Sequence, residues 1–425
     1  MSLNKFNSTI VSGVKWLAIY LIVGGIVGSA TAFFLQTLDY VTLLRTNHIW
    51  VVYFLPMAGL VIGLLYYYYG DAANEGNNLL IETHQSLEKG ETSKTIPFKM
   101  APMVFLSTLL THVAGGSAGR EGTAVQMGGA IADQFTAIFK INAVERKTIL
   151  IIGMSSGFAA VFGTPLAGAI FAIEILSIKK IKINQVFASF FVANIAHYSC
   201  LAWQVKHTLY SIPTIPAISM TTLAWTIVAG IIFGLTAFAF TSTGKLFENI
   251  FNKIKFAPLR PFIGGIIIAL FIVVFNSTKY IGLGIPTIQD AFINNAGQFD
   301  FAIKLILTSF TLSAGFKGGE VTPLFFIGAT LGNILIWFIP LPMALLAGMG
   351  FVAVFSGATN CVYTSIALGL ELFGMQAGVY IGLASIAAYF TSGPNGIYSA
   401  QLKVGLKYAA SVSYTHLTLP TNREV

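Results

Sequence analysis

Long apolar runs separated by short polar connections dominate the chain from end to end. Five of these runs lie at residues 14–38, 49–69, 149–178, 183–203 and 222–240. Each run is long enough to span, or nearly span, a hydrocarbon core that needs about 20 helical residues. The short alternating segments of a membrane β-barrel are absent from the sequence. The pattern therefore predicts an all-α polytopic membrane protein in a lipid bilayer.

The composition agrees with this class and excludes others. Only 9% of the residues are charged and the mean hydropathy is +0.77, whereas soluble domains carry about 25% charged residues. The net charge of +8 does not indicate a nucleic-acid partner, because the basic residues cluster in short connections that are typical of cytoplasmic loops. These clusters are Lys140, Arg146 and Lys147; Lys179, Lys180 and Lys182; and Lys245, Lys253, Lys255 and Arg260.

The sequence shows no residue pattern typical of an enzyme, metal or cofactor site. The two cysteines, Cys200 and Cys361, lie in apolar surroundings and are expected to be unpaired buried thiols. Nothing in the sequence resembles a nucleophilic triad, a phosphate-binding loop or a metal-ligand cluster. The first apolar run has no small-residue cleavage site, so we expect no cleaved signal peptide. The sequence predicts neither an enzyme nor a metal or cofactor.

The chain contains an internal repeat. "GREGTAVQMGGA" at residues 119–130 aligns without a gap with "GGEVTPLFFIGA" at residues 318–329, and "GFAAVF" at 157–162 matches "GFVAVF" at 350–355. We predict a first transmembrane repeat over residues 10–205, a connection over 206–220 and a second repeat over 221–410. Duplicated halves of this kind are common in secondary transporters, which bind their substrate where the halves meet.

Glycines interrupt one apolar segment in each half. Gly115, Gly116, Gly119 and Gly122 break the first, and Gly315, Gly318 and Gly319 break the second. Non-helical backbone is tolerated at membrane depth only where protein or a water-filled cavity satisfies its polar groups. Helices that begin after these glycines would direct free backbone amides inward and form a site for an anion.

Glu121 is the strongest functional candidate in the sequence. An acid within a membrane protein is costly and marks a functional site by default. At a helix N-terminus its carboxylate could occupy an anion site and leave it when protonated, which would exchange a bound anion for a proton. The structural alternative is that Glu121 pairs with Arg120 or only caps a helix; we favour the functional interpretation.

Glu320 occupies the matching position in the second half. Thr322 suits an N-cap and Pro323 suits the first helical turn, so capping alone explains this motif as well as a functional role does. Glu174 and Glu371 each close an apolar run, and for these two acids we favour an interfacial role in satisfying nearby helix ends.

Two further stretches offer hydrogen-bond donors. "EGNNLL" at residues 75–80 is expected to begin a helix, where Asn77 and Asn78 could donate to an anion or simply form a turn. Tyr398 follows a proline–glycine turn, where its hydroxyl could donate to an anion or lie in an interfacial aromatic belt.

These separated motifs together resemble the CLC superfamily of chloride channels and anion/proton antiporters. The resemblance covers residues 15–408 and rests on "GREG", "GGEVTP", "EGNNLL", "GFAAVFGTPLAGAIFAIE" and "GIYSA" in that family's order. It implies inverted repeats of tilted and broken helices, an anion held by helix N-termini, and a homodimer in which each subunit has its own pore. It also implies the inner (plasma) membrane of a bacterium.

The resemblance assigns roles to individual residues. Glu121 resembles the external gating glutamate, and Gly119, Arg120 and Gly122 belong to its motif. Asn77 stands at the central serine position, Val321 stands where an aromatic residue commonly follows the pore glycines, and Tyr398 resembles the pore tyrosine.

Departures from the chloride-type motifs resemble the fluoride-specific branch, the fluoride/proton antiporters. Thr123 replaces a proline, Ile175 occupies the place of the internal glutamate, and Glu320 and Thr322 belong to the motif of that branch. The resemblance thus implies a secondary active antiporter that exports fluoride in exchange for protons, with Glu320 substituting for the missing internal acid.

Two alternatives remain. The first is a chloride channel or a chloride/proton exchanger of the same fold, although Ile175 argues against the exchanger. The second is a membrane enzyme or scaffold with the same broken-helix plan, which no catalytic pattern supports. The final polar residues 411–425 are ill-matched to the family and are expected to be a non-native tail.

Overall fold

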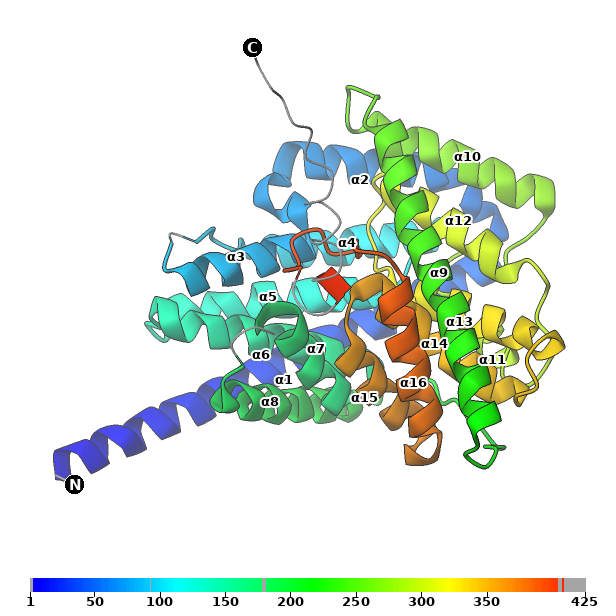
Figure 1. Cartoon of the computed structure of the whole chain (residues 1–425). Helices are drawn as coiled ribbons and strands as arrows, with labels where there is room; N and C mark the ends of the chain where they lie inside the picture. The colour runs from blue at the N-terminus through cyan, green and yellow to red at the C-terminus, as the bar shows by residue number, and fades with distance from the viewer. Residues whose placement is uncertain (1–2, 92, 178–180, 404–406, 409–425) are drawn as a thin grey trace, which may run out of the picture.

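A computed structural model describes residues 3–91, 93–177, 181–403 and 407–408, and within them every regular element is helical (Figure 1). The expected tail at 411–425 lies outside the described residues. The α-helices of the first half are α1 (Leu3–Asn47), α2 (Leu55–Tyr69), α3 (Asn77–Lys89), α4 (Met100–Val113), α5 (Glu121–Ile138), α6 (Ala143–Phe162), α7 (Pro165–Ser177) and α8 (Ile183–Ala202). Those of the second half are α9 (Met220–Phe251), α10 (Leu259–Phe275), α11 (Ile285–Asp290), α12 (Asp300–Ser313), α13 (Val321–Ile334), α14 (Met343–Thr359), α15 (Val362–Phe373) and α16 (Gly378–Thr391).

The chain combines long and short apolar helices. Four segments of the described residues are long and apolar enough to cross a membrane: Gly13–Asn47, Ile49–Tyr69, Ile183–Ala202 and Met220–Phe251. Seven further apolar helices have only 10–17 residues, whereas a straight crossing takes about 20. These lengths confirm the predicted all-α polytopic fold with broken helices.

The apolar run that begins at residue 149 is divided into two helices. The structure ends α6 at Phe162, turns at Gly163 in a left-handed conformation with φ 76°, and begins α7 at Pro165. Glycine accepts a left-handed backbone without strain, and proline suits the first position of a helix. Hydropathy cannot register this break, because the residues on both sides of it are apolar.

The two halves place equivalent helices in equivalent packing. α5 packs on α6 and α13 on α14, while α6 contacts α8 and α14 contacts α16. Both central pairs approach at glycines: a Cβ atom on Gly153 would lie 2.6 Å from the carbonyl oxygen of Gly128, and one on Gly328 would collide with Gly350. Small residues let membrane helices approach this closely. The residue boundaries of the two repeats remain a prediction.

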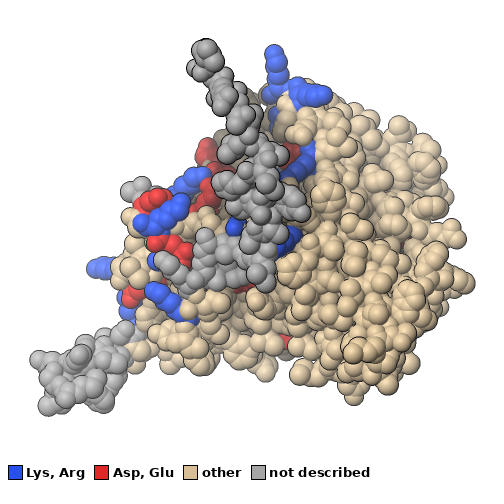
Figure 2. All heavy atoms as spheres, viewed as in Figure 1, with Lys and Arg blue, Asp and Glu red and all other residues tan. Residues whose placement is uncertain are grey.

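Charged side chains are segregated on the surface. Figure 2 shows them gathered over α3 and over the connection between α9 and α10, while the surface on the right of the view is largely uncharged. Exposed ion pairs join Lys94 to Glu75 and Lys99 to Asp71 on the charged side. The two cysteines, Cys200 and Cys361, are buried and unpaired as predicted.

Candidate anion site

Two broken-helix loops meet in the centre of the protein. The first runs from the end of α4 to the start of α5, and the second from the end of α12 to the start of α13. Gly119 and Gly319 exchange backbone hydrogen bonds of 2.5 and 2.8 Å in an isolated antiparallel bridge. Gly115 and Gly315 turn the two chains with φ values of 94° and 105°. α5 begins at Glu121 and α13 at Val321, so both helices begin just after Gly119 and Gly319, as predicted, and their free amides converge. Gly122, which was also expected to break the segment, lies inside α5.

The carboxylate of Glu121 binds to the start of the opposite helix. Oε2 accepts hydrogen bonds from the backbone N–H of Thr322 at 3.0 Å and of Arg120 at 3.1 Å, and Oε1 accepts one from Thr322 Oγ1. Glu121 is only 1% exposed. A carboxylate held by amides at a helix N-terminus occupies the kind of site that also binds a free anion.

Arg120 is a weaker partner for this carboxylate than Thr322. Its Nε lies 3.8 Å from Glu121 Oε1, and no hydrogen bond links the two side chains. The pairing with Arg120 that the sequence allowed is therefore a loose contact.

The N-cap predicted at Thr322 is wrong. The structure places the N-cap of α13 at Glu320, so Thr322 is the second helical residue and Pro323 the third. Its hydroxyl does not cap its own helix because the hydroxyl and the amide of Thr322 both donate to Glu121.

Glu320 and Asn77 both lie close to Gly122. A Cβ atom on Gly122 would be 3.3 Å from Asn77 Nδ2 and 3.9 Å from Glu320 Oε2. Asn77 is the first residue of α3, which begins where "EGNNLL" predicted a helix start. The structure thus brings residues from three helix starts, those of α3, α5 and α13, to one place.

Tyr398 and Val321 lie close to this group but are largely buried. Val321 is 1% exposed and Tyr398 is 6% exposed, with its ring 6.3 Å from that of Phe171. The loop that carries Tyr398 is fastened to α3, because the Ala400 N–H donates to Asn78 Oδ1 at 3.1 Å. Asn78 therefore positions this loop through its side-chain oxygen.

Two separate cavities reach the two acids. The first, of about 30 Å³, is called the Glu121 cavity and is lined by Glu121, Arg120, Thr322, His207, Tyr210 and Phe325, among others. The second, of about 540 Å³, is called the Glu320 cavity and is lined by Glu320, Lys317, Asn78, Ser313, Glu248 and Asn252, among others.

The two cavities share no lining residue, and of the two only the Glu320 cavity is lined by residues of α9. Glu248 belongs to the last turns of α9 and Asn252 follows it, whereas His207 and Tyr210 lie in the segment before its first residue. α9 has 32 residues, which at 1.5 Å per residue span about 48 Å, and it runs nearly the height of Figure 1. The paired Gly119 and Gly319 directly precede Arg120, which lines one cavity, and Glu320, which lines the other.

Glu174 and Glu371 form a reciprocal pair of helix caps. Glu174 of α7 accepts hydrogen bonds from the N–H groups of Tyr363 and Thr364 at 3.0 and 2.8 Å, at the start of α15. Glu371 of α15 accepts them from Leu166 and Ala167 at 2.9 and 2.8 Å, at the start of α7. The expected role of these acids in satisfying helix ends is confirmed.

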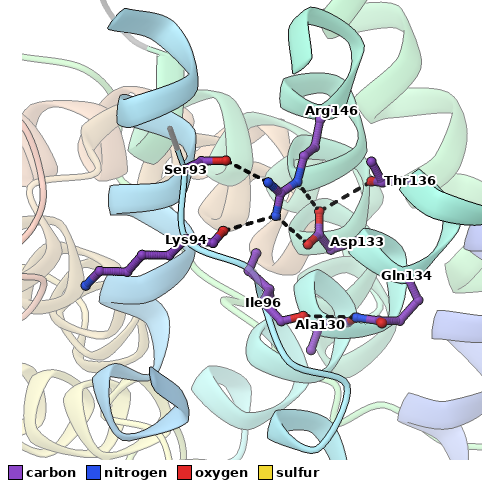
Figure 3. A network of polar contacts seen from close by, with 8 residues as sticks. All are labelled: Ser93, Lys94, Ile96, Ala130, Asp133, Gln134, Thr136 and Arg146. Carbon is purple, nitrogen blue, oxygen red and sulfur yellow. Dashed lines mark hydrogen bonds and ion pairs between the residues drawn. The ribbon is translucent and has the colours of Figure 1, made fainter. Parts of the chain in front are cut away.

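The far end of α5 is anchored by a buried charge pair (Figure 3). Arg146 donates to Asp133 from Nε at 2.7 Å and from Nη2 at 2.6 Å. It also donates to Ser93 Oγ and to the carbonyl of Lys94, in the loop that follows α3. This network ties α5, which carries Glu121 at its other end, to α6 and to the loop after α3.

Sequence reasoning missed two residues that line the cavities. Lys317 lines the Glu320 cavity with its Nζ 4.1 Å from the ring centre of Tyr66, and its position three residues before Glu320 could have indicated it. His207 lines the Glu121 cavity, but its segment was interpreted only as a connection. No group of three or more His, Cys, Asp or Glu side chains in the described part of the chain could hold a metal ion.

Comparison with known proteins agrees with this architecture. Residues 59–393 match the family model described as voltage gated chloride channel. The chain is 45% identical over 394 residues to a chloride/fluoride channel protein of Pseudomonas syringae pv. tomato, covering 91% of this chain and 86% of the relative. It is 26% identical to an H(+)/Cl(-) exchange transporter of Vibrio cholerae, covering 87% of this chain and 84% of that relative.

A solved structure agrees in fold as well as in sequence. The crystal structure of a CLC-type fluoride/proton antiporter superposes with a TM-score of 0.87 at 31% identity, covering 94% of this chain and 99% of that one. A slow cyanobacterial Cl-/H+ antiporter shares the fold, with a TM-score of 0.77 at 19% identity. On the family match and these relatives, this chain belongs to the CLC family of anion transport proteins.

Proposed function

We propose that this CLC-family transporter is a fluoride/proton antiporter that exports fluoride and uses Glu121 as its external gating carboxylate. One observation carries the proposal: the Glu121 carboxylate lies on the free amide of α13, where an anion would bind, while Glu320 lines a separate cavity. With one acid in each cavity, a proton can be taken up from one cavity and released into the other while an anion moves in the opposite direction.

The charge distribution orients the two cavities. The basic residues Lys245, Lys253, Lys255 and Arg260 lie at the end of α9 that borders the Glu320 cavity. Because basic loops are retained in the cytoplasm, the Glu320 cavity opens inward and the Glu121 cavity outward. The protein then spans the inner membrane of a bacterium with Glu121 toward the outside.

The exchange follows from the contacts of Glu121. While ionised, its carboxylate holds the Thr322 amide and hydroxyl and excludes another anion from them. A proton from outside neutralises it, so it releases these donors and fluoride can take them. Glu320, which lies near Gly122, accepts the proton and releases it into the inner cavity.

The donor set suits a small, strongly hydrated anion. Fluoride is a strong hydrogen-bond acceptor, and a site that removes its water must replace that water with dense donors. Thr322 offers a backbone N–H and a hydroxyl, and Asn77 offers an amide N–H₂ near Gly122. The relatives named for fluoride, at 45% and 31% identity, support this choice of anion.

The test is fluoride-driven proton movement in liposomes that contain the purified protein. An outward fluoride gradient should drive protons inward against their gradient, chloride should do so much less, and Glu121→Gln should abolish the coupling. Equal fluoride and chloride fluxes, or fluoride flux that Glu121→Gln leaves unchanged, would contradict the proposal.

A passive chloride channel is the second candidate, because the matching family model is described as a voltage gated chloride channel. A channel would move no protons against their gradient, so the same assay separates the two. The family resemblance also supports a homodimer with one pore in each subunit. Mass measurement of the protein in detergent, with bound detergent subtracted, tests that state directly.

A further inference from the structure

His207 lies beside the gating carboxylate in the folded chain, although 86 positions separate it from Glu121 in the sequence. It belongs to the segment between α8 and α9, and it lines the Glu121 cavity together with Arg120 and Thr322. We propose that His207 carries protons between the outer solution and Glu121, an inference that rests on the proposed antiport.

The imidazole ring is held in a fixed position. It lies against Gly163, where a Cβ atom would come within 2.5 Å of His207 Cδ2 and 3.0 Å of its Nε2. Gly163 is the left-handed residue that ends α6, so glycine both makes the turn and leaves room for the ring. On another side the ring stacks on His197 of α8, with 5.9 Å between centroids and 25° between planes.

One ring nitrogen of His207 is available for chemistry. Nε2 is buried and makes no hydrogen bond to any residue that the structure describes. Leaving a buried polar atom without a hydrogen bond is unfavourable, so water in the cavity is its natural partner. A cavity of about 30 Å³ holds roughly two water molecules, since one needs about 10–15 Å³.

The cavity is too small to hold bulk water through which protons could reach Glu121. Phe162, Phe325 and Phe351 form part of its wall, and a hydrated proton would lose most of its water between them. An imidazole solves this problem because it accepts a proton on one nitrogen and donates from the other. The proton thus enters as imidazolium and leaves to the Glu121 carboxylate through water in the cavity.

The charges around the ring favour transient rather than lasting protonation. Arg120 and Glu121 face it from α5, His197 from α8, and Tyr210 from its own segment. Burial lowers the pKa of His207, and the permanent charge of Arg120 lowers it further. Neutral imidazole is therefore the resting form, and each transfer returns His207 to it, so one proton enters and one reaches Glu121.

The experiment measures fluoride-driven proton uptake as a function of outer pH in liposomes. We expect His207→Ala and His207→Gln to slow coupled transport by about tenfold or more, since positioned proton carriers contribute about 10²–10⁴-fold. Imidazole added outside should restore much of the rate of the alanine variant. Lys206→Gln, a change at the exposed neighbouring residue, should stay within about twofold of the wild type.

A second readout separates proton transfer from folding. Fluoride should raise the thermal stability of His207→Ala as much as that of the wild type, because the anion site at Thr322 is intact. A wild-type rate and pH profile in His207→Gln would overturn the inference, as would a loss that imidazole does not restore or lost stabilisation by fluoride. If the wild type couples no protons to fluoride, the proposed antiport is wrong. If the wild type couples them and the His207 variants do so at the same rate, only the proposed role of His207 is wrong.

Discussion

Gly119 and Gly319 are linked by two backbone hydrogen bonds, so the helices that carry Glu121 and Thr322 start from one point of main-chain contact, called the glycine joint. The glycine joint has no room for a side chain. A Cβ atom on Gly319 would lie 2.7 Å from the backbone nitrogen of Gly122 and 3.1 Å from that of Glu121. The position of the Glu121 carboxylate on the opposite helix depends on this close approach of two main chains.

Gly319→Ala should therefore abolish transport and lower stability, because main-chain atoms cannot yield as a flexible side chain would. Anion flux and the melting temperature in detergent measure both effects. Gly25→Ala is the matched control, since nothing lies within 4 Å of its Cβ position in α1. A Gly319→Ala protein with wild-type flux would show that the glycine joint is not rigid.

Thr322→Val should weaken fluoride transport by about tenfold, because it removes the hydroxyl that donates to the anion site and keeps the backbone amide. A hydrogen bond to a charged group contributes about 1.5–3 kcal/mol. Thr322→Ser, which retains the hydroxyl, should recover most of the rate. Concentration dependence of fluoride flux measures the effect, and equal loss in both variants would assign it to packing.

Glu320→Gln should stop proton movement, because an amide cannot accept the proton that leaves Glu121. Glu248→Gln changes an exposed acid of the same cavity and is the matched control, expected within about twofold of the wild type. Simultaneous recording of fluoride and internal pH tests the pair. Unchanged proton uptake in Glu320→Gln would show that another residue accepts the proton from Glu121.

Glu174→Gln should keep the ratio of protons to fluoride while lowering thermal stability. Its carboxylate is occupied by the Tyr363 and Thr364 amides and the Thr364 hydroxyl, so it acts as a helix cap. Losing a charged cap costs on the order of 1 kcal/mol. A changed ratio would show that this acid takes part in proton transfer.

Sequence patterns identified what depends on local chemistry. The glycine breaks, the helix starts after them and the importance of Glu121 follow from residue types and spacing. The break at Gly163 was missed because apolar residues flank it on both sides. The place of His207 was missed because only the folded chain brings the connection before α9 against α6. The contacts of Glu121 with Thr322, 201 positions away, likewise needed the geometry.

Asp133→Asn should destabilise the protein by about 3 kcal/mol, because it leaves the Arg146 guanidinium without its partner in a largely buried network (Figure 3). Lys99→Gln breaks an ion pair whose side chains are 43% and 74% exposed, and such a pair contributes at most about 1 kcal/mol. Thermal inactivation in detergent compares the two variants. Because α5 carries Glu121, Asp133→Asn should also reduce fluoride transport at temperatures below unfolding. Equal stability of both variants would mean that the network does not anchor α5.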